Sequence, residues 1–385
     1  MNPLMLHEFH HGLNARFGEL NGAEIVSDYG DWLAEHAALR ETAGVIDLSF
    51  RSRICLTGAD RVRFLHGQVT NDVKKLRTGE GCYAVITTAK GKMESDLNIF
   101  ALADELLLDF EPGLTEKIAK RLEKFIVADD VQIVDVAAHY GLLSVQGLKA
   151  QEAVRALNLF PEIPTQQLGS IKISDATLGE IYLANNPRLD GTQGRAGSPL
   201  PAVGAHGVTR PTNFGFDLFI PNNSLGAVAD KLIAAAKQIG GRACGWTAFE
   251  TARIKAGIPR FGVDMDETNI PLECGIESRA IVYNKGCYIG QEVINRIHSV
   301  GHVNKELRGL HLANDLSALA VRGDKLFHAG KEVGYVTSAV KSPTLNANIA
   351  LGYVRREANQ IGNELTLRTA AGESPVKIAE LPFVK

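Results

Sequence analysis

The order of hydrophobic and polar positions predicts a strand followed by a helix near the start of the chain. Ile54 and Leu56 alternate with polar residues as in a strand, and Val62, Leu65 and Val69 then recur at helical spacing. The same order of strand, glycine turn and helix returns in residues 141–159, with the turn at Gly147. The repetition predicts two related α+β lobes.

Between and after these units the chain predicts further regular elements. The pattern indicates three successive strands within residues 82–112, a helix at 114–127, a strand at 131–137, a hairpin at 170–184, a strand at 214–221, and helices at 224–240, with Ser224 as N-cap, and 246–259. The segment 184–207 is rich in glycine and proline, lacks periodicity and is predicted to be a long irregular excursion.

The character of the chain changes after about Lys305. From there the segments are short, alternate between apolar and polar residues, and are separated by glycine turns. This pattern predicts an all-β tail that forms a small barrel or sandwich.

Composition narrows the class of protein. A formal net charge of -3 over 385 residues implies no general attraction to nucleic acid or to an anionic membrane. No apolar run approaches the ~20 residues that span a bilayer, and the first residues do not resemble a signal peptide. A cytoplasmic location is the expectation.

The cysteines argue against both a disulfide framework and a zinc site. Their number is odd and their spacing is wide and irregular. No pair of cysteines or histidines has the spacing of metal ligands, so no metal site is predicted. The five cysteines are Cys55, Cys82, Cys244, Cys274 and Cys287.

Cys287 has neighbours that can change its chemistry, within KGCYIGQE (residues 285–292). If this segment is extended, Lys285 and Cys287 point to the same face, and the ammonium favours the thiolate. A helix that starts near Gly290 would favour it further. The alternative is that Cys287 packs under this helix while Lys285 is solvated.

Two other places carry candidate binding residues. On an extended strand, Glu94, Asp96 and Asn98 share one face, which is either a solvated sheet surface or the wall of a cavity for a polar heterocycle. Arg253 adjoins the apolar stripe of the helix at 246–259. It is either a satisfied, partly buried arginine or a planar fork that holds a carboxylate or a ring.

The segment KGCYIGQE closely resembles the signature of the YgfZ family, folate-binding proteins of iron–sulfur cluster assembly and repair. That family lies within the glycine cleavage T-protein superfamily, and the likeness covers nearly the whole chain. Further similar blocks are GVIDLSFRSRICLTGADRVRFLHGQVTNDV, AFETARIKAGIPRFGVDMDETNIPLECGI and VGYVTSAVKSPTLNANIALGYV.

The resemblance implies two α+β lobes and a C-terminal β-barrel, arranged as three lobes around a central folate pocket. It implies a first lobe made of residues 1–45 with 136–245, a second made of 46–135 with 246–305, and a barrel over 306–385.

The resemblance also implies which residues contact tetrahydrofolate or a derivative. GKMESD keeps Asp96 of the T-protein's GGxxDD strand but has Ser95 in place of the other acid. RPTNFGFD has Asn213 where the T-protein has a pterin-binding glutamate, and Arg253 matches the arginine of the LRxEAG block. Together with Asn98, these residues are the expected folate contacts.

The resemblance therefore implies a folate-binding accessory factor for iron–sulfur cluster assembly or repair, with iron–sulfur client or assembly proteins as partners. Cys287 and Lys285 are the expected catalytic residues. The alternatives are a tetrahydrofolate-dependent aminomethyltransferase or demethylase, and a folate sensor in which Cys287 is inert. A shortage of acids around the pterin argues against the aminomethyltransferase, so a classical enzyme is not the first expectation.

Overall fold

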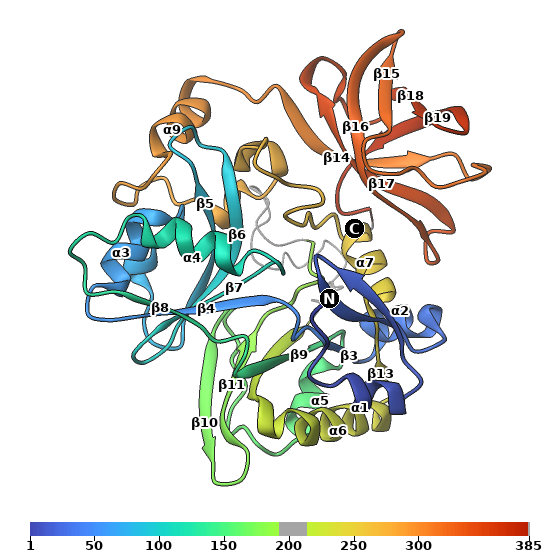
Figure 1. Cartoon of the computed structure of the whole chain (residues 1–385). Helices are drawn as coiled ribbons and strands as arrows, with labels where there is room; N and C mark the ends of the chain where they lie inside the picture. Colours follow the sequence, from blue (N-terminus) through green and yellow to red (C-terminus); the bar gives the residue numbers. More distant parts are fainter. Residues whose placement is uncertain (192–213, 384–385) are drawn as a thin grey trace, which may run out of the picture. The chain divides into compact units, whose positions relative to one another are not determined.

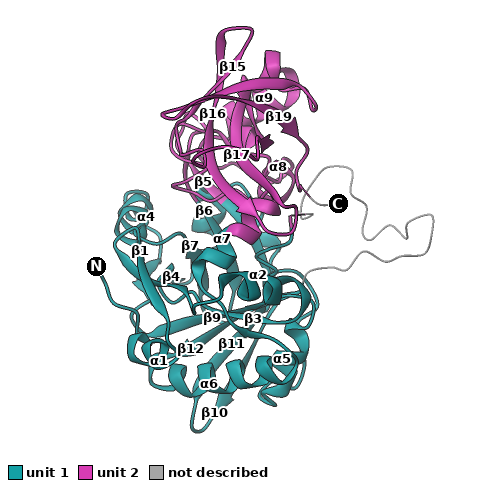
Figure 2. Cartoon of the chain, turned by 90° about the vertical axis from the view of Figure 1, so that its right-hand side faces the viewer, with its two compact units in different colours: residues 1–84, 96–190, 201–250 teal, residues 85–95, 191–200, 251–385 magenta. Residues whose placement is uncertain are grey.

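The computed structural model describes residues 1–191 and 214–383, which fall into two compact units. Among the described residues, the first unit comprises 1–84, 96–190 and 214–250, and the second comprises 85–95, 191 and 251–383 (Figure 2). The predicted division into three lobes has other boundaries and stays a prediction.

Six strands of the first unit form one sheet, in the order β10-β11-β12-β9-β3-β13. Figure 1 labels all of these strands except β12. Neighbouring strands are antiparallel except for β3 and β13, which are parallel. Two helices, α5 (Ala150–Ala156) and α6 (Asn222–Gln238), pack on this sheet and share its apolar core. The strands are β3 (Gly44–Asp47), β9 (Tyr140–Gln146), β10 (Ser170–Asp175), β11 (Gly179–Asn185), β12 (Gly215–Pro221) and β13 (Arg242–Ala243).

The predicted helix at 224–240 starts earlier than expected. Helix α6 begins at Asn222, after Pro221, so Ser224 lies inside the helix and is buried. The prediction that Ser224 caps the helix is wrong, because the proline fixes the backbone just ahead of the helix and takes the N-cap position.

A second sheet has the order β5-β6-β7-β4-β8. Its strand β6 alternates as predicted, with Met93, Ser95 and Leu97 buried and Asp96 and Asn98 half-buried. Helix α4 packs on β4 and β8. The elements are β4 (Ser52–Thr57), β5 (Gly81–Thr87), β6 (Met93–Ala101), β7 (Leu106–Phe110), β8 (Gln132–Asp135), α3 (Arg61–Gln68), η1 (Val73–Lys75) and α4 (Thr115–Glu123).

The two predicted strand–glycine–helix units are present as β4–α3 and β9–α5. Gly147 has a φ of 123°, and a Cβ there would lie 2.5 Å from the carbonyl oxygen of Thr42. Any other residue would therefore meet backbone as well as strain. The first compact unit also contains α1 (His7–Gly12), the hairpin β1 (Arg16–Leu20) and β2 (Ala23–Asp28), and α2 (Trp32–Glu41).

The second unit ends in a closed six-stranded barrel, in the order β14-β17-β16-β15-β18-β19. The predicted α+β fold with a C-terminal β-barrel is therefore confirmed. The barrel consists of β14 (Lys305–Leu312), β15 (Lys325–His328), β16 (Lys331–Ser342), β17 (Ala347–Arg355), β18 (Glu364–Thr369) and β19 (Gly372–Ala379), with η3 (Arg356–Ala358) after β17. It follows α7 (Trp246–Lys255), η2 (Pro271–Cys274), α8 (Glu277–Ala280) and α9 (Gln291–Val300).

The predicted irregular excursion and the predicted lack of a membrane-spanning segment remain to be compared with the structure. Most of the irregular excursion at 184–207 lies outside the described residues. Within the part of the chain that the structure describes, no helix has both the length and the apolar character needed to cross a bilayer.

Buried charges join β7 of the second sheet to β12 of the first sheet, and both strands lie in the first unit. Arg188 donates from Nη2 to Asp109 of β7 at 2.8 Å and to Asp217 of β12 at 2.6 Å. Arg51 donates to the other oxygen of Asp109 at 2.7 Å, and Asn98 donates to Asp109 Oδ2 at 3.1 Å. Burial alone would raise the pKa of Asp109, but the charges of Arg188 and Arg51 outweigh it and hold the pKa well below its usual range.

Replacing Arg188 with methionine should strongly destabilise the protein. The change leaves the buried carboxylates of Asp109 and Asp217 without their shared cation, which typically costs about 3–5 kcal/mol. Urea unfolding followed by circular dichroism measures the free energy of unfolding. The control Arg63→Met removes an exposed pair with Asp129 and should change it little.

The same ion network contributes to the pH dependence of stability. Because the folded-state pKa of Asp109 is depressed, its contribution is present above the unfolded value of about 3.9 and is lost as pH falls below it. The gap between wild type and Arg188→Met should therefore narrow in acid. A gap that stays constant from neutral pH to pH 3 would contradict this assignment.

Candidate functional site

The segment around Cys287 consists of turns joined by residues without regular secondary structure, and it is not a strand. Tyr283 to Lys285 form a turn or bend, and helix α9 begins at Gln291. Lys285 is buried whereas Cys287 is exposed. The prediction that both side chains share one strand face is wrong.

Local contacts explain why lysine and cysteine separate. The Lys285 ammonium lies 5.0 Å from the centre of the Tyr288 ring, and the same ring is buried. Burial raises the pKa of Tyr288 to about 12, so its hydroxyl stays neutral. Packing of these two long side chains leaves the short side chain of Cys287 facing water.

The chain after Cys287 is fixed against the β5–β6 turn. Thr87 donates its hydroxyl to the carbonyl of Ile289 at 2.6 Å. Gly290 has a φ of 89°, and a Cβ there would lie 2.5 Å from the carbonyl oxygen of Thr88. The side chain of Gln291 accepts from the Tyr288 amide at 3.3 Å. The predicted helix start at Gly290 is confirmed, and the glycine is required by both the backbone conformation and the close approach.

A second set of contacts links the residues before Cys287 to helix α9, which follows it. No pattern in the sequence indicated these contacts. Glu277 Oε1 accepts from the Tyr283 hydroxyl at 2.6 Å and lies 2.8 Å from His298 Nδ1. The rings of Tyr283 and His298 stack with centres 3.8 Å apart. Burial, followed by the bond to Glu277, raises the pKa of Tyr283. The spacing of these three residues in the sequence does not predict their contact, because the fold of the intervening loop brings them together.

Exposure distinguishes Cys287 from the other cysteines. Cys55, Cys244 and Cys274 are buried, Cys82 is half-buried, and all five are free thiols. In the described residues, no group of three or more His, Cys, Asp or Glu side chains is placed to hold a metal ion. Within the described residues, Cys287 is therefore a single exposed thiol and not part of a metal site.

The polar face of β6 brings Asp96 beside a residue that the sequence analysis did not single out. The Tyr83 hydroxyl of β5 donates to Asp96 Oδ2 at 2.7 Å. Two residues further along, the Asn98 amide is bonded to Asp109. Asp96 thus presents a half-buried carboxylate with a phenol beside it, while Asn98 has a structural partner. Folate contacts by both residues stay predictions.

Arg253 is a buried arginine bonded inside the second unit. It pairs with Asp264 and donates to Ser338 Oγ at 2.9 Å and to the carbonyl of Ile258 at 3.2 Å. These bonds give Arg253 structural partners within the protein, and its folate contact stays a prediction. Asn213 lies outside the described residues.

Comparison with known proteins identifies the family. Residues 6–184 and 210–285 match the family model of the GCVT N-terminal domain, and residues 305–385 match the glycine cleavage T-protein C-terminal barrel domain. The chain belongs to the glycine cleavage T-protein superfamily. This membership confirms the superfamily part of the resemblance.

Several curated relatives cover almost all of this T-protein superfamily chain. The aminomethyltransferase of Corynebacterium jeikeium is 29% identical over 390 residues, which is 98% of this chain and 97% of that protein. The aminomethyltransferase of Geobacillus thermodenitrificans is 28% identical over 377 residues, covering 96% of each. The crystal structure of glycine cleavage system aminomethyltransferase T from Bartonella henselae is similar with a TM-score of 0.82 and 22% identity. The match covers 100% of this chain and 98% of that one, and at this identity it shows the fold alone.

Alkylation should label Cys287 first. Because Cys287 is the exposed cysteine, brief treatment with iodoacetamide at neutral pH should modify it ahead of the other four, as measured by peptide mass spectrometry. Cys287→Ser should abolish the fast phase, whereas the control Cys82→Ser should keep it. Faster labelling of a buried cysteine would show that the loop is not held as described.

Proposed function

We propose that this protein binds a tetrahydrofolate and acts, through Cys287, as an accessory factor in the assembly or repair of iron–sulfur proteins. The observation that carries the proposal is the exposed thiol of Cys287, held in a loop by contacts on both sides. The segment that holds it is the one that resembles the YgfZ signature. Clients or assembly proteins with iron–sulfur clusters are the proposed partners, and the cytoplasm is the proposed location.

The residues of β6 fit a reduced folate. Tetrahydrofolate is the cofactor of the aminomethyltransferases in this superfamily, where it accepts the one-carbon unit. A pterin ring offers N–H donors, and the half-buried carboxylate of Asp96 is an acceptor suited to them. The Tyr83 hydroxyl, bonded to Asp96 at 2.7 Å, orients that carboxylate on the strand face. Asp96 would thus position the ring, with Tyr83 holding Asp96.

The thiol chemistry proposed for Cys287 needs a second protein. Iron–sulfur clusters are held by several thiolates, and one cysteine supplies one ligand. The exposed position allows a client to approach the sulfur, whereas the four other cysteines are buried or half-buried. Cys287 would therefore give a single thiolate to iron whose remaining ligands come from the client. Lys285, buried behind Tyr288, is proposed to shape the loop that presents this thiolate.

Aminomethyl transfer to tetrahydrofolate is the second candidate function. The curated relatives named above are aminomethyltransferases, and they support this activity more directly than they support a role with iron–sulfur proteins. Ser95, where the T-protein strand has an acid, and Asn213, where it has a glutamate, argue against it. Assays of binding and turnover separate the two.

Tetrahydrofolate should raise the melting temperature of the protein in proportion to the logarithm of its concentration. Ligand at 100 times its Kd stabilises the folded state by about 2.7 kcal/mol. Asp96→Asn removes a charged acceptor and should weaken binding roughly 10- to 150-fold, while the control Asp104→Asn changes an exposed residue of the same unit and should not. Arg253 is a poor choice for this test, because its replacement would disrupt the buried pair with Asp264.

The same preparation should form no methylene-tetrahydrofolate from an aminomethylated carrier protein. Binding without turnover supports the accessory factor. Robust turnover that Asp96→Asn abolishes would establish the aminomethyltransferase instead. Absence of folate binding would reject both candidates.

Cys287→Ser should abolish the activity in cells while the fold survives. Serine keeps the shape of the side chain but removes the soft thiolate. In a deletion strain, iron–sulfur enzyme activities should be restored by wild type and by the control Cys82→Ser but not by Cys287→Ser. Equal melting temperatures of the three proteins would exclude misfolding, and full restoration by Cys287→Ser would reject the role of this thiol.

A further inference from the structure

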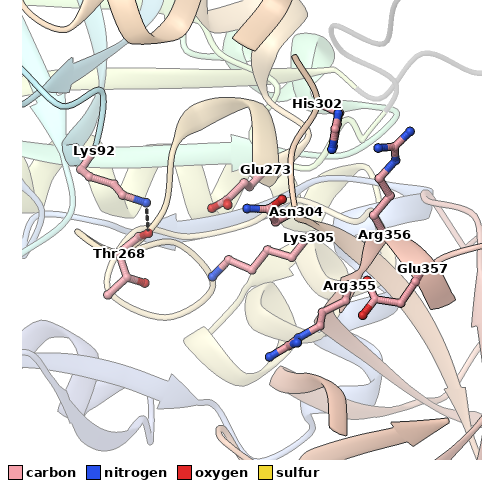
Figure 3. A pocket seen from close by; sticks show the side chains of 9 residues that line it. All are labelled: Lys92, Thr268, Glu273, His302, Asn304, Lys305, Arg355, Arg356 and Glu357. Atoms are coloured by element: carbon pink, nitrogen blue, oxygen red, sulfur yellow. Dashed lines mark hydrogen bonds between the residues drawn. The ribbon is translucent and has the colours of Figure 1, made fainter. Parts of the chain in front are cut away.

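The second unit contains an open cavity of about 860 Å³ away from the residues discussed so far (Figure 3). This volume lies within the range of about 300–1,000 Å³ that small-molecule sites occupy. The cavity is lined by Lys92, Thr268, Glu273, His302, Asn304, Lys305, Arg355, Arg356 and Glu357.

Pairing of the barrel strands brings two of its cations together. Lys305, the first residue of β14, is the direct partner of Arg355, the last residue of β17. Like charges directly opposite each other destabilise a sheet. The amide of Arg356 donates to the carbonyl of Asn304 at 3.0 Å. This bond joins the residue after β17 to the residue before β14. Lys92 reaches the same cavity from the β5–β6 turn and donates to the carbonyl of Thr268 at 2.5 Å.

The acids that line the cavity do not neutralise these cations. Glu273 accepts from the amides of Ile270 and Asn269 at 3.2 and 3.3 Å, and Glu357 pairs with Lys331 at 3.7 Å. Lys92 and Lys305 are bonded to neutral oxygens, the latter to the Tyr335 hydroxyl at 3.1 Å. Arg355 and Arg356 are exposed, and neither forms an ion pair within residues 1–191 and 214–383. The cavity therefore carries an excess of positive charge in a protein with a formal net charge of -3.

The lining also indicates what part of a ligand would bind. Among the described lining residues, His302 supplies the only ring, so the cavity offers little surface for stacking a heterocycle. Arginine guanidinium groups bind phosphate and carboxylate through two parallel hydrogen bonds. The side chains of Arg355 and Arg356 extend in different directions (Figure 3), so they would reach two separate anionic groups.

We propose that this cavity binds a small molecule with two or more phosphate or carboxylate groups. Arg355 and Arg356 hold separate oxyanions, and Lys92, Lys305 and Asn304 donate to the remaining oxygens. The proposal is independent of the folate and of Cys287, since none of their residues lines the cavity. Binding would relieve the repulsion between Lys305 and Arg355 that the strand register imposes.

Isothermal titration calorimetry of the full chain at constant ionic strength tests the proposal. The probes are inorganic triphosphate, citrate and, as a single oxyanion, sulfate. Triphosphate or citrate should bind more tightly than sulfate, and the tighter of the two identifies phosphate or carboxylate as the preferred group. The double variant Arg355→Gln/Arg356→Gln should raise the Kd by at least about tenfold, the typical effect of losing a charged hydrogen bond.

The matched control is Lys341→Gln/Lys377→Gln. It also removes two positive charges, but from exposed positions on the barrel outside the cavity. Its Kd should equal that of wild type, and melting curves should show that both double variants fold. The proposal is overturned if the control weakens binding as much as the arginine variant does, or if sulfate binds as well as triphosphate and citrate. It is also overturned if the wild type binds an oligo-glutamate peptide but neither multivalent probe, which would indicate a protein partner instead.

Discussion

The buried carboxylate of Asp109 is the constraint on which the first unit depends. Two arginines and one amide converge on it, and one of those arginines also holds Asp217 on the other sheet. A buried charge is tolerable only when several partners replace its water, so none of these residues can change alone. The network therefore fixes β7 against β12, and through Asn98 it fixes β6. Asp96 then has a defined position on β6 beside Tyr83.

The second unit has a buried ion pair of its own, and it explains a residue that the sequence leaves ambiguous. Asp264 pairs with Arg253 of α7 and accepts from the hydroxyls of Thr337 and Ser338 on β16, both at 2.6 Å. The pair thus ties α7 to the barrel. An arginine in a motif shared across a superfamily suggests ligand binding, but these contacts give a structural reason for it that needs no ligand.

Much of the fold could be predicted because it is recorded in local patterns. The alternation in β6 and the glycines after β4 and β9 predicted the correct elements. The change of pattern near Lys305 predicted an all-β tail and left a barrel or a sandwich open, and the resemblance implied the barrel. The conformation at Lys285 and Cys287 could not be predicted from alternation, because it depends on contacts distant in sequence. Thr87, which bonds to Ile289, lies 202 residues away. Cys287 is exposed. Its predicted role as a reactive thiolate stays a prediction, and the shared strand face with Lys285 on which that prediction partly relied is wrong.

The sites also differ in what sequence can reveal. Cys287 stands out because a cysteine between glycine and tyrosine has a recognisable context, whereas Tyr83 and Glu277 act only through partners that the fold supplies. The cationic cavity could not be predicted from the sequence either, because the fold brings its residues together. Its residues come from four separate stretches of chain, and only the pairing of β14 with β17 places Lys305 opposite Arg355.

The two candidate functions place their chemistry on different units of the chain. Aminomethyl transfer depends on acids near the pterin, and the described one, Asp96, belongs to the first unit. The proposed work with iron–sulfur proteins depends on Cys287, which belongs to the second unit and is held by Thr87 and by the Glu277, Tyr283 and His298 contacts. Because these contacts do not involve Asp96, a change at either residue leaves the local support of the other intact. If Asp96 contacts the folate as proposed, substitutions such as Ser95 and Asn213 could remove transfer chemistry without changing the contacts that hold Cys287.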